Sequence, residues 1–297
     1  MLSKITYYFI YGWLYLHALL PFRVLYFLSD ILYFFVRYIV RYRIRIVRKN
    51  MKNSFPEKTE TELSKLEKEF YHHFCDYFVE TIKLLRISNE EMQKRMIFKN
   101  TDAINNILKT GNSCLVYLGH YGNWEWVPSI TLAFDKNIVF GQIFKNLNNK
   151  AFNQLFLKLR SRFGSIGISK GDTFRGIVRL RNEGKQMVIG FIADQTPSYS
   201  NINFWTRFLN QETPVFTGVE RIAKQTGFGV VYLDINRTGR GMYIAECKLI
   251  TNTPKSEPEH AITEKYIHMI EKTILRNPSF WLWSHNRWKY KKEDFIQ

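Results

Sequence analysis

A histidine and a carboxylate stand close together in the sharpest local pattern of the sequence. His120 and Glu125 are separated by four residues in the segment HYGNWE, which follows the apolar run Cys114–Leu118. A histidine just past the carboxyl end of a parallel strand lies where ligands bind in open α/β sheets. Asn123 is placed to cap a following helix, which would put Glu125 in its first turn. In that arrangement the carboxylate holds one ring nitrogen and leaves the other as a general base.

The base would act on a nucleophile that the substrate itself brings. The sequence contains neither a GxSxG elbow nor an HExxH pair. His72, His73 and Cys75 lie in one helical segment, but adjacent helical positions point about 100° apart, so a structural role is favoured over metal binding. We therefore expect no metal site and no cofactor.

The elements that must position these residues alternate along the chain. Four short apolar runs with strand character are separated by helical patterns, and they cover residues 114–118, 138–144, 187–193 and 230–235. Strands that alternate with helices predict an α/β domain with a mostly parallel central sheet flanked by helices. Met242–Ile250, after the turn-forming TGRG, is expected to add an antiparallel strand, and Glu259–Arg276 to form the last helix.

The first 45 residues are expected to form a separate hydrophobic and basic membrane anchor, and residues 46–297 the catalytic domain. Ile5–Leu20 is almost free of charge, but 16 helical residues span only about 24 Å, less than a bilayer core. The longer stretch to Val40 contains Pro21, Arg23 and Asp30, which are unfavourable at mid-bilayer. The anchor therefore either spans the membrane as one kinked helix, forms a helical hairpin or lies in the interface as a helix.

Positive charge follows the apolar stretch directly. The chain carries 43 Lys and Arg against 26 Asp and Glu, a net charge of +17, and Arg37–Lys52 is the densest basic segment. The positive-inside bias places the rest of the chain on the cytoplasmic side. An anionic lipid surface fits this charge. A nucleic acid partner is not expected, because no nucleic-acid-binding motif accompanies the charge.

Several blocks of the sequence resemble one family. HYGNWE resembles the His-x4-acid motif of the glycerolipid acyltransferase superfamily, and the surrounding sequence is similar to its lipid A late acyltransferase branch. The blocks that carry the resemblance are Lys49–Met51 with Phe55 and Pro56, the pair Asp194 and Gln195, and the segment Trp281–Lys289. They stand in the family's order over nearly the whole chain. Lys145 departs from the family, where an arginine is expected, and Asn286 stands where a basic residue is common.

The resemblance implies transfer of a fatty acyl group from a thioester to a lipid hydroxyl at the inner membrane. His120 would be the base and Glu125 its orienting partner. The donor would be acyl carrier protein, and the acceptor a lipid A precursor in the membrane. Asn123 and Gly122, by their backbone N–H groups, or else Lys145 or Arg162, would stabilise the oxyanion.

Two further roles stay open at this point. Arg160 and Arg162 suit either an acceptor phosphate or a helix end. Asp194 would either position the acceptor or pair with an arginine.

Two other functions also stay open. The acceptor could be a different hydroxylated lipid, such as an amino-acid lipid or a lysophospholipid. Outside enzymology, the alternative is a basic module that binds a membrane surface or a nucleic acid, and only the charge supports it.

Overall fold

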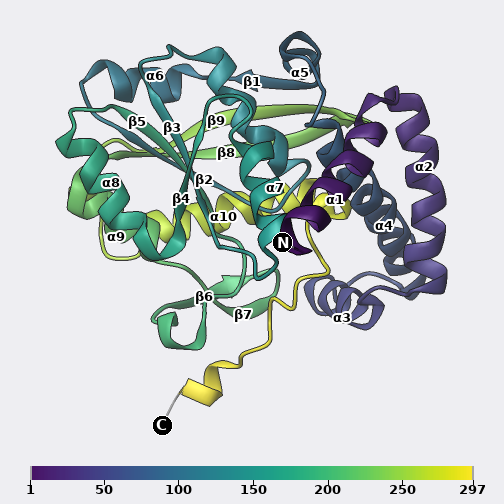
Figure 1. The fold of residues 1–297 in the computed structure, drawn as a ribbon. Helices are drawn as coiled ribbons and strands as arrows, with labels where there is room; N and C mark the ends of the chain where they lie inside the picture. The colour runs from purple at the N-terminus through teal and green to yellow at the C-terminus, as the bar shows by residue number, and fades with distance from the viewer. Residues whose placement is uncertain (1, 296–297) are drawn as a thin grey trace.

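A seven-stranded sheet forms the centre of the computed structural model, which describes residues 2–295 (Figure 1). In spatial order the strands are β1 (Met96–Lys99), β9 (Met242–Thr251), β8 (Gly229–Gly239), β2 (Cys114–Leu118), β5 (Met187–Ile192), β3 (Val139–Phe144) and β4 (Ile166–Ser169). Every neighbouring pair is parallel except β8 and β9, which form an antiparallel hairpin. The predicted α/β fold with a mostly parallel sheet and one added antiparallel strand is confirmed.

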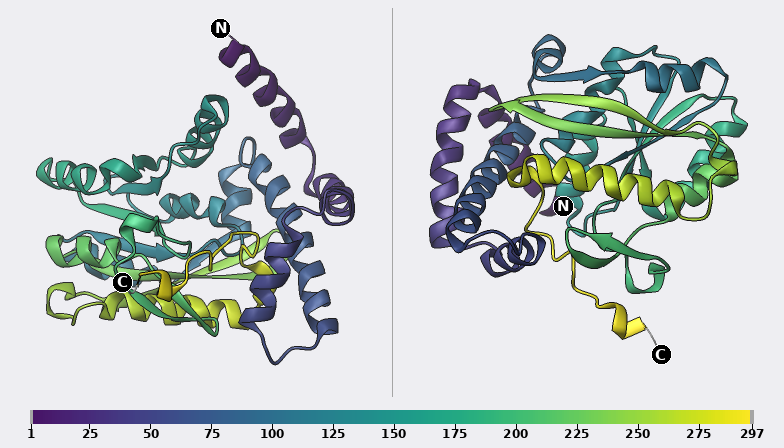
Figure 2. Two further views of the ribbon diagram at one scale, coloured as in Figure 1. Left: turned by 90° about the horizontal axis from the view of Figure 1, so that it is seen from below. Right: turned by 180° about the vertical axis from the view of Figure 1, so that it is seen from behind.

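Helices cover both faces of this sheet. Figure 2 shows α10 (Ala261–Arg276) and α9 (Gly218–Thr226) on one face, with the 3₁₀ helix η2 (Trp124–Ala133) and α7 (Lys150–Arg160) on the other. Since both faces are covered, the central strands are apolar throughout, and all five residues of β2 are buried. Because β2, β5, β3 and β4 are parallel to one another, their carboxyl ends meet at one edge of the sheet.

The predicted elements are largely present, with differences that have local causes. The helix expected to follow Asn123 is the 3₁₀ helix η2, which contains Pro128 and so cannot keep a regular α-helical ladder. The strands β1 and β4 were not expected, because runs of four residues carry little periodicity. The remaining elements are α5 (Asn89–Arg95), α6 (Asp102–Lys109), α8 (Thr173–Asn182), the hairpin β6 (Trp205–Phe208) and β7 (Gln211–Pro214), and the short helices η3 (Lys170–Asp172), η4 (Tyr199–Asn201), η5 (Pro254–Ser256), η6 (Pro278–Phe280) and η7 (Lys292–Phe295).

The N-terminal apolar stretch forms two helices that meet at Pro21. α1 (Leu2–Leu19) ends before Pro21, and α2 (Phe22–Phe34) continues into a π-helical turn, η1 (Phe35–Ile39). Among residues 2–295 no single helix has the length and hydropathy to cross a membrane. The segments Tyr7–Leu19 and Phe22–Ile39, bent by 119° at their break, have them only when taken together. The bend at Pro21 follows from the missing backbone N–H of proline.

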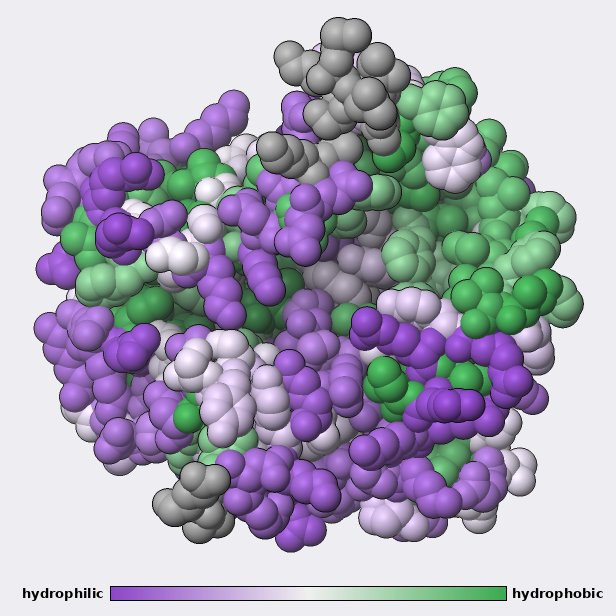
Figure 3. All heavy atoms as spheres, turned by 60° about the horizontal axis from the view of Figure 1, so that its bottom comes forward, coloured by the Kyte–Doolittle hydropathy of each residue, from purple (hydrophilic) through white to green (hydrophobic). Residues whose placement is uncertain are grey.

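One side of this helical pair presents a large apolar surface. Figure 3 shows hydrophobic residues gathered on one side of the molecule, beside a mainly hydrophilic surface. The exposed large apolar residues of α1 and α2 are Tyr8, Phe9, Trp13, Leu16, Leu19, Val24, Phe27, Ile31 and Phe34. A contiguous exposed apolar surface marks a site of interaction with a membrane or a protein.

The opposite side of the pair packs on the body of the protein. α3 (Ile44–Ser54) and α4 (Glu60–Lys83) follow the pair in the chain, and α4 contacts both α1 and α2. Lys83 Nζ donates to the carbonyl oxygens of Ala18 and Leu20 at 2.9 and 2.6 Å. A lysine that satisfies the last carbonyls of a helix stabilises the helix end. The domain boundary expected after residue 45 falls within α3. The contacts of α4 with α1 and α2 join the two predicted parts of the chain.

Candidate active site

Two neighbouring parallel strands bring His120 and Asp194 together. Leu118 and Ile192 are register partners at the ends of β2 and β5, and each of the two polar residues follows its strand end by two positions. The Nδ1 atom of His120 lies 2.7 Å from Asp194 Oδ1, and the backbone N–H of His120 donates to Asp194 Oδ2 at 2.9 Å. The sheet register thus provides a histidine–carboxylate pair at the ligand-binding edge.

Asp194 holds its negative charge firmly. Its side chain is 1% exposed, and Oδ2 also accepts from Trp281 Nε1 at 2.7 Å. Burial raises the pKa of this carboxyl, but the charge of His120 and the three hydrogen bonds outweigh it and lower the pKa to about 2. An ionised Asp194 fixes the His120 tautomer that carries its proton on Nδ1.

The other ring nitrogen of His120 is then a hydrogen-bond acceptor. Its only contact of this kind among the described residues is Gln195 Nε2, at 3.2 Å. The His120 side chain is 19% exposed, so this nitrogen is reachable from outside the core. An imidazole with one nitrogen bonded to a carboxylate and the other available is the arrangement of a general base.

The expected contact between Glu125 and His120 is wrong. Glu125 is 3% exposed and pairs with the guanidinium of Arg160, with Nε to Oε2 at 2.8 Å and Nη2 to Oε1 at 2.5 Å. Arg160 is the last residue of α7, and its planar fork matches a carboxylate on two bonds. A buried carboxylate requires such a partner, and Asp194 already occupies the place at His120.

The sequence left the role of Arg160 open, and in the structure its guanidinium pairs with Glu125. Its Nη1 atom has no hydrogen-bond partner among the residues described, and its side chain is 26% exposed. The pair connects to His120 through aromatic contacts. Tyr77 lies 3.5 Å from Glu125 Oε1 and stacks on Trp124 at 4.2 Å, and Trp124 contacts the His120 ring edge-on at 5.2 Å.

The Asn123 side chain does not form the helix cap that the sequence suggested, and it lies in the core. It makes no side-chain cap to η2, is 0% exposed, and donates from Nδ2 to Glu80 Oε2 at 2.7 Å. The backbone N–H of Gly122, expected as a possible oxyanion donor, already donates to the carbonyl of Phe280 at 3.0 Å. Gly122 has φ +60°, which turns the chain back toward the core and explains why a residue without Cβ stands here.

The two other predicted cations differ from each other. Arg162 donates to the backbone carbonyls of Leu85, at 3.1 Å, and Ile87, so its guanidinium is engaged with the end of the α4 region. Lys145 is exposed at the end of β3. Its neighbour across the β3–β4 register is Lys170. The pKa of Lys170 is lowered by burial and by the charge of Lys145. Of these two predicted anion-binding residues, only Lys145 has no hydrogen-bond or ion-pair partner among residues 2–295.

The C-terminal aromatic block supports the Asp194 side of the site from within the core. Trp281 and Trp283 are buried, and Trp281 supplies the bond to Asp194 already described. His285 Nε2 accepts from the backbone N–H of Thr196 at 3.3 Å, and burial lowers the His285 pKa to about 4. Arg287 is 0% exposed and donates to Pro214 O at 2.7 Å. The block therefore closes the core beside Asp194.

Sequence reasoning missed two residues of this site. Gln195 was visible in the Asp-Gln pair after its strand, but nothing in the pattern assigned its amide to His120. Arg160 was recognised as basic, yet its distinction from Arg162 depends on which way each points at the end of α7.

Within residues 2–295 no group of three His, Cys, Asp or Glu side chains could hold a metal ion.

Comparison with known proteins agrees with this geometry. No curated protein matches the chain. The family model described as bacterial lipid A biosynthesis acyltransferase matches residues 1–290, which is nearly the whole sequence and includes every site residue named above. The chain therefore belongs to the bacterial lipid A biosynthesis acyltransferase family and is an acyltransferase of that type.

Proposed function

We propose that the protein transfers a fatty acyl group from an acyl carrier protein thioester to a hydroxyl of a lipid A precursor, at the cytoplasmic face of the inner membrane. The single observation that carries the chemistry is the His120–Asp194 pair at 2.7 Å, with Nε2 of His120 reachable from outside. Family membership supports the reaction class. The donor, the face of the membrane and the residue roles are parts of the proposal.

The reaction would proceed without an acyl-enzyme. His120 Nε2 accepts the proton of the acceptor hydroxyl while the hydroxyl oxygen forms a bond to the thioester carbonyl carbon. The tetrahedral intermediate then collapses, the carbon–sulfur bond breaks, and the leaving thiolate takes the proton back from Nε2. Asp194 stabilises the imidazolium that exists between these two transfers. The products are an ester and a thiol, and the base is regenerated.

Glu125 acts in this proposal through Arg160. The bidentate contact uses two of the guanidinium nitrogens and fixes the plane of the group, which leaves Nη1 without a hydrogen-bond partner among the described residues. A held cation can stabilise the negative oxygen of the tetrahedral intermediate without reorganising during the reaction. Arg160 is thus the proposed oxyanion donor, and Glu125 is its positioning residue.

Lys145 and Lys170 are proposed to contact an anionic group of a substrate. They end two adjacent parallel strands at the same edge as His120 and Asp194. In spatial order β3 and β4 are the second and third strands from β2, so the two lysines lie about 10 to 15 Å from the base. A lipid A precursor and the phosphopantetheine arm of a carrier protein both carry a phosphate that such lysines could bind.

The N-terminal surface supports membrane association. The exposed apolar residues of α1 and α2 are followed in the chain by exposed basic residues of α3, which include Arg45 and Lys49. Apolar residues beside a basic segment are typical of proteins that rest on anionic lipid. The high positive charge would also attract an acidic carrier protein by long-range steering.

The test is an assay with purified wild-type protein, acyl carrier protein or coenzyme A thioesters as donors, and a lipid A precursor or a lysophospholipid as acceptor. Mass spectrometry should show one added acyl group on the lipid A precursor, with the carrier protein as the better donor. His120→Ala should lower kcat by roughly 10²–10⁴-fold. His268→Ala, which removes an exposed histidine of α10, is the matched control and should leave kcat unchanged.

Transfer to the lysophospholipid alone would reject the proposed acceptor. A His120→Ala variant with wild-type kcat would reject the proposed base.

A further inference from the structure

The loop that carries His120 is held from behind by α4. His73 Nε2 lies 3.2 Å from the carbonyl oxygen of Gly122, and Glu80 Oε2 accepts from Asn123 Nδ2 at 2.7 Å. The backbone carbonyl of Glu80 also accepts from Trp126 Nε1 at 3.1 Å. Two points of the HYGNWE segment, and Trp126 directly after it, are therefore fixed by two residues of one helix, which are 3% and 0% exposed.

These holding residues are themselves held by the β8–β9 hairpin. Arg237 contacts His73 Nδ1 at 3.4 Å and donates to Asp76 Oδ2 at 2.9 Å. Since His73 donates from Nε2 to a carbonyl, its Nδ1 is the acceptor for Arg237. Burial and the charge of Arg237 lower the His73 pKa to about 3, so this ring stays neutral. Tyr243 of β9 donates to Glu80 Oε2 at 2.8 Å.

The remaining support comes from α2. Tyr26, Ser29 and Asp30 are spaced i, i+3, i+4 and so share one face of that helix. Tyr26 OH donates to Glu80 Oε1 at 3.1 Å, and Ser29 Oγ donates to Asp76 Oδ1 at 2.8 Å. α2 thus contacts Glu80, which binds Asn123 of the loop, and Asp76, which binds Arg237.

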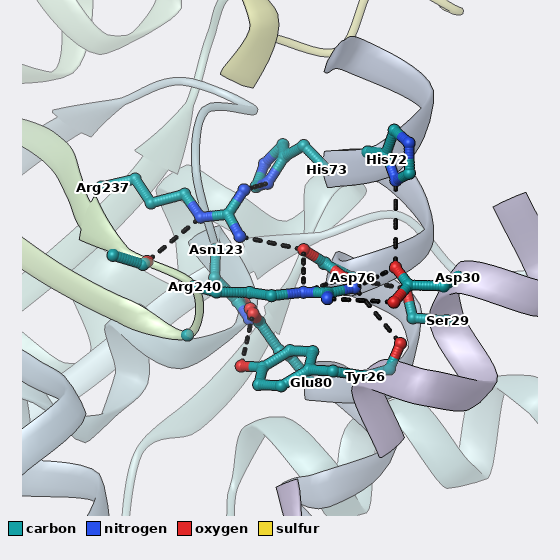
Figure 4. Close-up of polar contacts among 12 residues, drawn as sticks. Tyr26, Ser29, Asp30, His72, His73, Asp76, Glu80, Asn123, Arg237 and Arg240 are labelled. Atoms are coloured by element: carbon teal, nitrogen blue, oxygen red, sulfur yellow. Dashed lines mark hydrogen bonds and ion pairs between the residues drawn. The ribbon is translucent and has the colours of Figure 1, made fainter. Parts of the chain in front are cut away.

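Arg240 closes the contact between α2 and α4. Its guanidinium donates to Asp30 Oδ1 and to Asp76 Oδ1, both at 2.6 Å, and lies over the Tyr26 ring at 4.6 Å. Figure 4 shows these side chains converging between the two helices. We call this set the α2–α4 network, and its members are Tyr26, Ser29, Asp30, His73, Asp76, Glu80, Asn123, Arg237 and Arg240.

The other face of α2 is the apolar one. Val24, Phe27, Ile31 and Phe34 are 40%, 64%, 41% and 54% exposed and follow a helical stripe away from the network. One short helix therefore carries the surface suited to lipid on one side and the support of the active-site loop on the other. A displacement of α2 cannot occur without breaking contacts to Glu80 and Asp76.

We propose that Glu80 and His73 are positioning residues for His120, and that α2 is part of the active-site scaffold because it holds them through Tyr26, Ser29, Asp30 and Arg240. The N-terminal helical pair is then a structural component of the catalytic centre as well as a membrane contact. This inference rests on the proposed function only for its kinetic readout.

The mildest test is Tyr26→Phe, which removes one hydroxyl from the network without changing the ring. The expected result is a fall in kcat of about fivefold to tenfold with an unchanged KM for the acceptor, because a small shift of a catalytic group lowers the rate without weakening binding. Tyr33→Phe is the matched control on the same helix. Its ring packs edge-on against Tyr38 and stacks on His72, and the variant should keep the wild-type kcat.

A second pair of variants distinguishes positioning from bulk stability. Glu80→Leu removes the acceptor of three donors and should lower kcat by about 100-fold, whereas Glu80→Gln keeps an acceptor for Asn123 and should restore kcat to within about threefold of wild type. Equal losses in both variants, or no loss in Tyr26→Phe and Glu80→Leu, would overturn the proposal.

Hydrogen exchange gives a readout that needs no activity. The amides of Gly122 and Trp126 donate within the structure, to Phe280 O and Asn123 O. In the full chain, Tyr26→Phe should speed exchange in peptides that cover residues 119–126, while Tyr33→Phe should not. Faster exchange in an enzyme that transfers no acyl group would keep this proposal and reject the proposed function. Unchanged exchange in Tyr26→Phe would reject the scaffold role of α2.

Discussion

The two sides of the HYGNWE loop each hold a buried carboxylate, and the two carboxylates differ in their partners. Asp194, in front of the loop, is paired with a histidine and has its pKa lowered to about 2. Glu80, behind the loop, accepts only from neutral donors, Asn123, Tyr243 and Tyr26. Burial and nearby Asp76 raise the Glu80 pKa, Arg237 and the bonds from Asn123 and Tyr243 oppose this, and the result is about 7.

The difference indicates what each side is built for. A carboxylate that stays ionised over the whole physiological range can orient a base and stabilise its charged form. A carboxylate that exchanges its proton near neutrality is poorly suited to that task, but its several acceptor positions can hold a loop in place. The front of the loop is therefore equipped for proton transfer and the back for positioning.

The largest expected effect comes from the front carboxylate. In Asp194→Asn the amide can present its NH₂ to Nδ1 of His120, which moves the ring proton to Nε2 and removes the base. We expect kcat to fall by about 10³–10⁴-fold while the protein remains folded. Circular dichroism and a single-turnover assay would check both parts. A loss below about tenfold would remove Asp194 from the proton-transfer step.

The next effect concerns the Glu125–Arg160 pair. Arg160→Ala leaves a buried, unpaired Glu125 carboxylate and should lower the free energy of unfolding by about 3–5 kcal/mol. The double variant Glu125→Gln/Arg160→Gln removes both charges and should recover most of that stability. It should not recover activity, since the proposed oxyanion donor is gone. Denaturant unfolding together with kcat would check this, and a fully active double variant would exclude the pair from catalysis.

The sequence predicted the central fold, and it singled out a histidine at the end of a strand as the candidate base, because both depend on local patterns. Continuous apolar strands such as β2, and a histidine directly after one, are visible without a structure. The partner of that histidine was not predictable in the same way. Glu125 is near in sequence, but the choice of Asp194 depends on β5 lying beside β2, which is a nonlocal pairing. The same holds for Glu80, which faces Asn123 across 43 residues of chain.

The back carboxylate should reveal itself in the pH dependence of stability. The folded chain binds the Glu80 proton more tightly than the unfolded chain, so between about pH 4.5 and 7 this group lowers stability as the pH rises. His73 and His285 act in the opposite direction in part of that range, because burial lowers their pKa values. The difference between wild type and Glu80→Gln isolates Glu80.

Thermal unfolding of both proteins at pH 5 and pH 7.5 would measure this contribution. We expect Glu80→Gln to gain stability relative to wild type as the pH rises. The groups that face Glu80 and remain in the variant are Tyr26 of α2, Asp76 of α4, Arg237 of β8, Tyr243 of β9 and Asn123 of the loop. A pH-independent difference between the two proteins would show that Glu80 keeps one protonation state over this range.

The smallest expected effect is that of Gln195, in front of the loop. Its amide lies 3.2 Å from His120 Nε2, which is the position that the acceptor hydroxyl must take. Gln195→Ala removes this competitor, so KM for the acceptor should fall by about threefold, in keeping with the loss of one modest hydrogen bond in the free enzyme, while kcat stays within about twofold. Gln154→Ala, an exposed position on α7, is the matched control. A fall in kcat of tenfold or more would mean instead that Gln195 orients the hydroxyl during transfer, and the front of the loop would then contain a second positioning residue.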